Sequence, residues 1–317
     1  MKLRSLAPIS AALLIVVACG GPAATTAPPT GTPTTAPTAA ATTAAPSPTA
    51  AATVCDNLPA EAAGDMLETI CEAGVIRVAT DPAYPPQSEL LPDGTFEGFD
   101  IDTANAIGER LGVTVQFETP DFAEVQAGGW ADRFDISVGS MTITEVRLGV
   151  LDFTQPYYFT PAQMGATEAS GITTLEGLAG KTACAGEDTT YFHWIEGSLE
   201  LAGDVPEPAV VPEGLQSTTF STDTECNDAV VAGRTEFEGW LTSSTTLDNA
   251  IENGGPWVLV GDPVFYEALA VALDKSAADH DQLLAALDTI VGEMHADGTL
   301  TASSMEWFNG LDLTKSQ

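Results

Sequence analysis

Residues 135–147 read Asp-Ile-Ser-Val-Gly-Ser-Met-Thr-Ile-Thr-Glu-Val-Arg, an apolar strand pattern that runs directly into a predicted helix. Thr142 and Glu145 have the Thr-x-x-Glu spacing of a capping box, which predicts that the helix begins at Thr142. A helix start attracts an anion, because its first backbone N–H groups are unpaired and lie at the positive end of the helix dipole. Arg147 adds a planar guanidinium that matches a carboxylate. The stretch therefore predicts a carboxylate site, and the alternative is an ordinary capped helix with a solvated arginine.

Three other motifs flank this stretch in order. Before it come Gly-Val-Ile-Arg-Val-Ala-Thr-Asp-Pro-Ala-Tyr-Pro-Pro at 74–86 and Asp-Gly-Thr-Phe-Glu-Gly-Phe-Asp-Ile-Asp at 93–102. After it comes Leu-Asp-Phe-Thr-Gln-Pro-Tyr-Tyr at 151–158. In this order and spacing the four motifs resemble the family 3 solute-binding proteins of ABC importers, which are receptors for polar amino acids. The resemblance covers residues 73–310.

The resemblance implies an α/β, two-lobed periplasmic-binding-protein-like fold of type II with a ligand cleft between the lobes. The first lobe is expected at 55–162 plus 265–317 and the second at 163–264. Crossing segments near 158–164 and 262–269 would be the hinges that close the lobes around a ligand. Such a protein is no enzyme: it captures a small polar solute, expected to be an amino acid, cationic ones included, and delivers it to an ABC permease.

Apolar periodicity from residue 75 onward predicts alternating strands and helices in two series. The first has strands at 75–79, 113–117 and 134–138 and helices at 100–111, 122–127 and 142–148. The second has strands at 182–185, 209–211, 237–241, 257–260 and 265–273 and helices at 189–196, 223–232, 247–253, 277–296 and 303–308. Alternation of this kind predicts a mostly parallel sheet with helices on both faces.

The resemblance also assigns roles to the residues of the opening stretch. Arg147 matches the family arginine that grips the ligand α-carboxylate, and Thr142 matches the residue whose hydroxyl and amide assist it. Ser140 stands where the family uses a backbone or hydroxyl contact, and Met141 lies between them in the predicted site.

Further ligand contacts are implied elsewhere in the chain. Tyr84 and Phe122 match two rings that sandwich the ligand side chain, a sensible arrangement for an aliphatic stem that carries a cation. The alternative for Phe122 is core packing. Asp81 matches an acid that meets the distal amine of basic ligands, although Asp-Pro also indicates a turn. Thr189 and Thr190 are expected to reach the ligand carboxylate from the second lobe on closure.

One departure from the family concerns the ligand α-ammonium. The family usually has Gly-Arg-x-Asp-x-x-x-x-Asp, whose last Asp binds that group. Residues 233–241 read Gly-Arg-Thr-Glu-Phe-Glu-Gly-Trp-Leu, which puts Leu241 at that position. Either Glu238 or Glu187 substitutes for the missing acid, or the ligand lacks an α-amino group.

The N-terminal residues indicate export. Residues 1–19 combine a basic start with an apolar core too short to span a membrane, which is typical of a secretory signal. Val-Val-Ala-Cys at 16–19 resembles a lipobox, so Cys19 is expected to carry lipid; the alternative is a plain signal peptide. Residues 20–54 are rich in Ala, Thr and Pro and predict a disordered tether. The protein is thus expected outside the cytoplasm, lipid-anchored to the cell membrane.

Four cysteines remain after Cys19, and four allow three pairings. We favour Cys55–Cys71 and Cys184–Cys226, because each pair then stays within one predicted lobe. A zinc site is the alternative, but the sequence has no Cys-x-x-Cys and only three histidines. No metal or cofactor is predicted.

The sequence has 45 acidic and 10 basic residues and a formal net charge of −35. Such a chain repels nucleic acid and anionic lipid headgroups, so neither is expected as a partner, and the membrane is reached by the lipid anchor only. A monomer is expected. The alternative functions are an enzyme on the same fold, such as a cyclohexadienyl dehydratase, and a ligand-sensing module. The sequence shows no Gly-x-Ser-x-Gly motif or metal-ligand spacing that would favour an enzyme.

Overall fold

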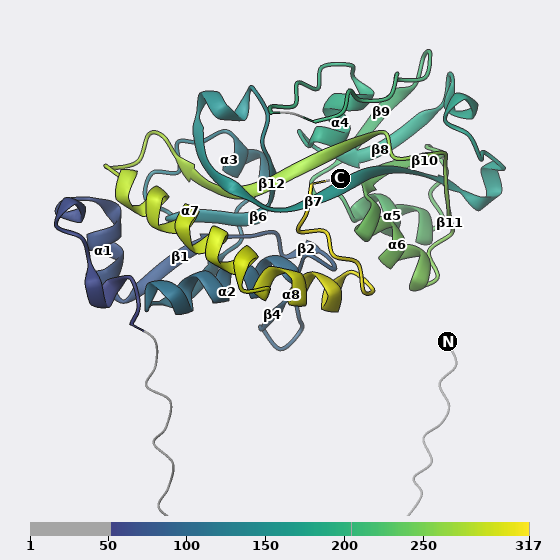
Figure 1. Ribbon diagram of the computed structural model, residues 1–317. Helices are drawn as coiled ribbons and strands as arrows, with labels where there is room; N and C mark the ends of the chain where they lie inside the picture. The colour runs from purple at the N-terminus through teal and green to yellow at the C-terminus, as the bar shows by residue number, and fades with distance from the viewer. Residues whose placement is uncertain (1–51, 204, 317) are drawn as a thin grey trace, which may run out of the picture. The chain divides into compact units, whose positions relative to one another are not determined.

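The computed structural model describes residues 52–203 and 205–316. Within these residues the centre of the fold is a nine-stranded sheet in the order β5-β1-β6-β12-β7-β10-β8-β9, with β11 paired to β7 (Figure 1). A small second sheet contains β2 (Ala83–Tyr84), β3 (Ser88–Leu90) and β4 (Phe96–Glu97). No helix in the described part of the chain is long and apolar enough to cross a membrane.

The first lobe is built on the parallel strands β1 (Val75–Ala79), β5 (Thr114–Glu118) and β6 (Ile136–Thr142). Its helices are α1 (Met66–Ala73), α2 (Phe99–Leu111), α3 (Phe122–Gln126), α7 (Asp281–Ala296) and α8 (Thr299–Trp307). Helix α2 buries Ile101, Ala104, Ile107 and Leu111 against the core, the helical spacing that the sequence predicted. It ends at Gly112, whose φ of 90° suits a residue without a side chain.

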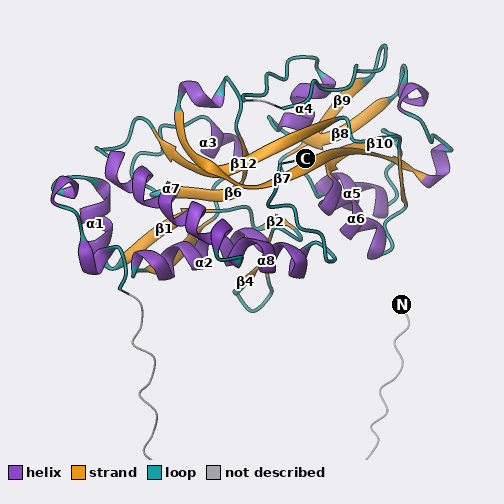
Figure 2. Cartoon of the chain, viewed as in Figure 1, coloured by secondary structure: helices purple, strands orange, loops and turns teal. Residues whose placement is uncertain are grey.

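The second lobe contains β8 (Thr182–Gly186), β9 (Gln216–Phe220) and β10 (Gly239–Ser243). Helices α4 (Thr190–Ile195), α5 (Glu225–Val231) and α6 (Ser244–Glu252) accompany them (Figure 2). Strand β11 (Trp257–Leu259) completes the lobe (Figure 1). Its apolar side chains form clusters separate from that of the first lobe.

Two long strands join the lobes. Strands β7 (Leu151–Thr167) and β12 (Phe265–Asp274) pair in antiparallel fashion from Asp274 opposite Leu151 to Phe265 opposite Ala162. Figure 1 shows both strands crossing the centre of the molecule. The predicted crossing segments at 158–164 and 262–269 largely coincide with this pair. The two-lobed α/β architecture is therefore present as expected, but the sheet is mixed rather than mostly parallel, because β7 and β12 run antiparallel to their neighbours.

Two predicted elements are wrong. The chain forms no helix at 142–148: β6 continues through Thr142, which pairs with Leu269, and only a short 3-10 turn follows at Arg147–Gly149. The capping box is absent because β-branched residues here join a sheet that offers them pairing partners. The predicted strand at 209–211 is also absent; β9 begins at Gln216 instead. Pro208 and Pro212 flank the predicted strand and lack the N–H that a ladder requires.

Both predicted disulfides are confirmed. The Cα atoms are 5.3 Å apart in Cys55–Cys71 and 5.8 Å apart in Cys184–Cys226. The first pair links the 3-10 turn at Cys55–Asn57 to α1, and the second joins β8 to α5. Cys19, the predicted signal and nearly all of the predicted tether lie outside the described residues.

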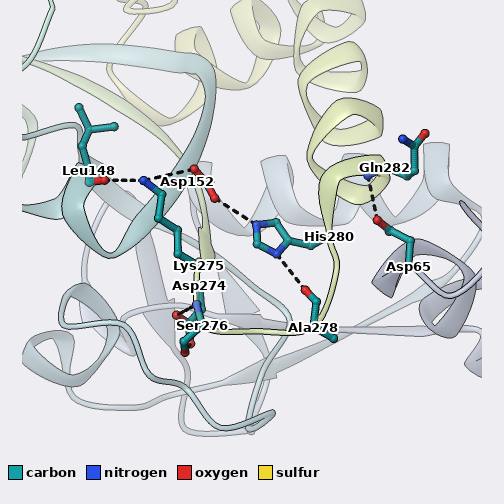
Figure 3. Close-up of polar contacts among 9 residues, drawn as sticks. All are labelled: Asp65, Leu148, Asp152, Asp274, Lys275, Ser276, Ala278, His280 and Gln282. Carbon is teal, nitrogen blue, oxygen red and sulfur yellow. Dashed lines mark hydrogen bonds and ion pairs between the residues drawn. The ribbon is translucent and has the colours of Figure 1, made fainter. Parts of the chain in front are cut away.

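Contacts with distant segments fix the start of α7 (Figure 3). The Asp65 carboxylate accepts hydrogen bonds from the backbone N–H groups of Gln282 and Leu283. The ring of His280 lies between the Asp152 carboxylate and the backbone carbonyl of Ala278. The helix that covers the core of the first lobe is thus capped by another helix's N-cap residue rather than by its own sequence.

Candidate functional site

A pocket lies between the two lobes, where β6, β12, α3 and the segment before β2 face α4 and the β9–α5 loop. Eight of the residues predicted from sequence line it: Asp81, Tyr84, Phe122, Ser140, Thr142, Arg147, Thr189 and Thr190. The lining also includes residues that the sequence prediction missed: Gly139, Gly186, Tyr191, Ser221, Thr222, Asp223 and Glu267.

Three predicted residues do not line this pocket. Met141 is fully buried in an apolar cluster with Trp130. Glu187 is exposed at the surface. Glu238 forms an ion pair with Lys181, with 3.0 Å between Oε1 and Nζ, so its carboxylate is engaged outside the pocket. Neither glutamate is placed to substitute for the missing acid, and Leu241 belongs to the core of the second lobe.

Arg147 provides the positive charge of the pocket. Its side chain is 4% exposed; Nε and Nη2 donate to Gln126 Oε1 at 3.1 and 2.9 Å, and Nη1 donates to the Thr142 carbonyl at 2.9 Å. Its Cζ lies 5.2 Å from the centre of the Phe122 ring. Burial lowers the pKa of Arg147 to about 10, which leaves it charged at neutral pH.

The guanidinium keeps two donors for a ligand. These contacts use three of the five N–H groups of Arg147, and one remains on each terminal nitrogen. It forms no ion pair with any carboxylate of the described residues. A guanidinium with an N–H left on each terminal nitrogen can donate to both oxygens of a carboxylate.

Three carboxyl groups line the same pocket as this cation. Asp81 is partly buried and accepts one hydrogen bond, from the Ala83 N–H at 2.7 Å; burial raises its pKa. Asp223 is 5% exposed and accepts from the Gly186 N–H at 3.0 Å and from the Thr242 hydroxyl. Burial raises the pKa of Asp223 to about 7.

Glu267 is the third. Its carboxyl is 1% exposed and accepts hydrogen bonds from the hydroxyls of Thr142, Thr190 and Tyr191. Burial raises its pKa, opposed by these bonds and by Arg147. Three carboxyl groups and one guanidinium thus line the pocket, and a cationic ligand group beside a carboxyl would favour its ionised form.

A buried network supports the first-lobe wall behind Ser140. The Ser140 hydroxyl donates to Asp100 Oδ2 at 2.8 Å, and the Tyr157 hydroxyl donates to Asp100 Oδ1 at 2.7 Å. Ser140 has a φ of 52°, in the left-handed region that few residues other than glycine adopt. Burial raises the pKa of Asp100 to about 7. The network holds the end of β6 in an uncommon conformation beside the pocket.

Polar contacts join the two lobes around the pocket. Tyr84 Oη lies 2.9 Å from Tyr191 Oη, and Gln126 Nε2 donates to the Asp188 carbonyl at 2.9 Å. Gln87 is fully buried and donates to the hydroxyl of Thr245 at 2.8 Å. The structure is therefore a closed arrangement in which both lobes contribute walls to one site. Within the described ranges no cluster of metal-ligating side chains occurs.

Residues 76–310 match the model of the bacterial extracellular solute-binding proteins, family 3. The chain belongs to this family. Its place outside the cytoplasm agrees with the two disulfides, which persist in oxidising compartments.

Two relatives and a solved structure show the range of the similarity. The chain is 26% identical over 252 residues to the L-cystine-binding protein TcyJ of Escherichia coli strain K12, covering 79% of this chain and 88% of the relative. It is 25% identical over 252 residues to an L-arginine-binding protein of Pseudomonas aeruginosa, covering 77% and 91%. An ancestral arginine-binding protein bound to arginine is 26% identical, with a TM-score of 0.63 over 74% of this chain and 98% of that one. All three are named as binding proteins, in line with the expectation that this chain is no enzyme.

A sequence signal existed for one of the missed residues. Glu267 is the only charged residue among the first nine residues of β12, in which most side chains are buried. A lone acid in a buried strand indicates a partnered or functional carboxyl. Asp223 had no such signal, because it lies among polar residues before α5 and only the fold turns it inward.

Proposed function

We propose that this family 3 protein is a receptor that captures an amino acid with a cationic side chain and delivers it to an ABC permease. The observation that carries the proposal is that Arg147, with two N–H groups left unused by the described residues, lines the same pocket as three carboxyl groups. A ligand with one carboxylate and two cationic groups matches this charge distribution. The arginine-binding relative and the arginine-bound ancestral structure support the same class of ligand.

Each charged group of such a ligand has a candidate partner. Its α-carboxylate would pair with Arg147. Its α-ammonium would pair with Asp223, which replaces the family aspartate at whose position this chain has Leu241. Its distal cation would meet Asp81, whose second oxygen accepts no hydrogen bond from the described residues. Tyr84 and Phe122 would flank the aliphatic stem.

Capture is proposed to occur by hinge closure between lobes at 55–162 plus 265–317 and at 163–264. The long pair β7 and β12 supports this, because only such crossing segments need to bend when the lobes part. The receptor is proposed to be a monomer held at the cell membrane by lipid on Cys19 and by the tether at 20–54. Replacing Cys19 with serine is expected to release the protein into the medium, and retention in the membrane fraction would contradict the anchor.

Titration calorimetry with a matched panel tests the ligand class. The panel comprises L-arginine, L-lysine, L-histidine, L-glutamine, L-cystine, L-glutamate and agmatine, which is arginine without its carboxylate. L-arginine or L-lysine is expected to bind most tightly, agmatine at least about thirtyfold more weakly than L-arginine, and L-glutamate not measurably. Tight binding of L-glutamate, or equal binding of agmatine and L-arginine, would contradict the proposal.

A further inference from the structure

The Glu267 carboxyl accepts hydrogen bonds from two hydroxyl groups, those of Thr142 and Thr190, that the sequence predicted to bind the ligand. The hydroxyls of Thr142 and Thr190 both donate to Glu267 Oε1 at 2.6 Å. The Tyr191 hydroxyl donates to Oε2 at 2.8 Å. A carboxylate of the protein itself thus lies where two predicted donors for the ligand carboxylate converge, and Arg147 forms no ion pair with it.

The three hydroxyls come from different parts of the molecule. Glu267 lies on β12, opposite Thr160 of β7, where the two strands cross between the lobes. Thr142 ends β6, which pairs with β12, so its bond to Glu267 stays within the first lobe. Thr190 and Tyr191 belong to the first turn of α4 in the second lobe. Two of the three bonds therefore form across the cleft.

The network continues beyond Glu267. Tyr191 donates its single hydroxyl proton to Glu267, so the contact between Tyr84 and Tyr191 places Tyr84 as the donor. Tyr84 belongs to the first lobe and lines the pocket. Thr142, Glu267, Tyr191 and Tyr84 form a polar chain that passes from the first lobe to the second and back.

We propose that Glu267 is a positioning residue that clasps α4 to the crossing strand when the lobes close and thereby sets ligand affinity. This inference rests on the proposed receptor function. Thr142 holds the Glu267 carboxyl in position, and Thr190 and Tyr191 donate hydrogen bonds to it when the lobes close. Hydrogen bonds to a carboxyl group in a water-poor site are stronger than in water, so these contacts favour the closed state. Apparent affinity rises with the fraction of closed protein, because only that state encloses the ligand.

The opposite role is the main competitor. If Glu267 merely mimics a ligand carboxylate, it competes with the ligand for Thr142 and Thr190, and its removal tightens binding. A clasp and a competitor therefore predict opposite signs for the same substitution.

Substitution of Glu267 distinguishes the two roles. Glu267→Ala removes the clasp and is expected to weaken L-arginine binding at least about tenfold. Glu267→Gln keeps one oxygen for the two threonines and can donate its amide N–H to Tyr191, so it is expected to lose less. Glu196→Gln, which removes an exposed charge at the end of α4, is the matched control and is expected to bind within twofold of wild type.

Cross-lobe variants test the mechanism. Thr190→Val and Tyr191→Phe each remove one bond to Glu267 and are expected to weaken binding severalfold in wild type. In a Glu267→Ala background the same changes should cost less, because the shared partner is already gone. If Glu267→Ala fails to fold, the Thr190→Val, Tyr191→Phe double variant takes its place.

Calorimetry and small-angle scattering separate the possible outcomes. Unchanged or tighter L-arginine binding by Glu267→Ala overturns the clasp. If wild type binds no member of the ligand panel, the proposed function fails instead. The clasp is then judged from the ligand-free proteins: a larger radius of gyration for Glu267→Ala than for wild type supports it, and an equal radius overturns it.

Discussion

Arg147 and Glu267 are buried ionisable residues that line one pocket, exposed by 4% and 1%, but their hydrogen-bonding groups are satisfied in different ways. Arg147 donates to a neutral amide and a carbonyl and keeps two N–H groups free. Both oxygens of Glu267 accept hydrogen bonds from hydroxyl groups of the protein. Buried polar groups in folded proteins nearly always have partners. A buried ionisable group with unused hydrogen-bonding capacity therefore indicates a group that binds a ligand. A group whose hydrogen-bonding capacity is filled by the protein indicates a structural role.

The largest expected effect follows from the spare capacity of Arg147. Truncating one partner of a desolvated, hydrogen-bonded charge pair costs about 2–5 kcal/mol, or about 30- to 4,000-fold in affinity. Arg147→Ala is expected to weaken L-arginine at least about thirtyfold in calorimetry, because the ligand carboxylate loses its guanidinium partner. Arg147→Lys should recover part of the loss, since a point charge lacks the two-pronged geometry. Binding within a few-fold of wild type would place the carboxylate elsewhere.

Asp100, whose two oxygens both accept hydrogen bonds from the protein, tests the comparison through the pH dependence of stability. Burial raises its pKa to about 7 in the folded protein, above the ordinary value of 3.8. The folded state therefore keeps a proton that the unfolded state has lost, and the stabilisation from this carboxyl falls as pH rises from about 4 through about 7. Between pH 5 and 8 this loss is about 3 kcal/mol at most, at 1.36 kcal/mol per pH unit.

Replacing Asp100 with asparagine should flatten this dependence. Asparagine cannot ionise, so the free energy of unfolding of Asp100→Asn, measured by urea denaturation, should fall less than that of wild type between pH 5 and 8. An equally steep fall in both proteins would show that other groups, such as Asp223, dominate. If Asp100→Asn bound L-arginine more weakly but kept the pH dependence of wild type, the distinction between unused and filled hydrogen-bonding capacity would be wrong.

Asp81 resembles Arg147 in its spare capacity, and its effect should depend on the ligand. Asp81→Asn is expected to weaken L-arginine about 10- to 100-fold, since the distal cation loses its partner, while L-glutamine changes less than about threefold. Asp223→Asn is the matched variant: it should weaken both ligands, because both carry an α-ammonium. Calorimetry of the two ligands on both variants separates the roles. Equal losses for both ligands on Asp81→Asn would refute its assignment to the distal cation.

Glu238 is expected to give the smallest effect. Its carboxylate pairs with Lys181 at a partly exposed site outside the pocket. Surface pairs contribute about 0–1 kcal/mol, so Glu238→Gln should shift stability by less than that and leave L-arginine affinity within about twofold. A large loss of affinity would restore Glu238 as the substitute for the family aspartate.

Local patterns in the sequence determined the parts of the protein that depend on neighbouring residues. The four ordered motifs indicated the two-lobed fold, and both disulfide pairs followed from keeping each pair within one lobe. Asp81, Tyr84, Ser140 and Arg147 were found because each belongs to a continuous motif.

Tertiary structure alone decided what depends on partners far along the chain. Thr142 continues a strand because β12, more than a hundred residues away, pairs with it, and its hydroxyl goes to Glu267 for the same reason. Asp223 faces the pocket, whereas Glu238 turns outward to Lys181. Periodicity shows which residues are buried, but only long-range strand pairing decides which buried polar groups meet. Arg147 and Asp81 could therefore be predicted from continuous motifs, whereas Asp223, Glu267 and the hydrogen-bond partners of all four could not.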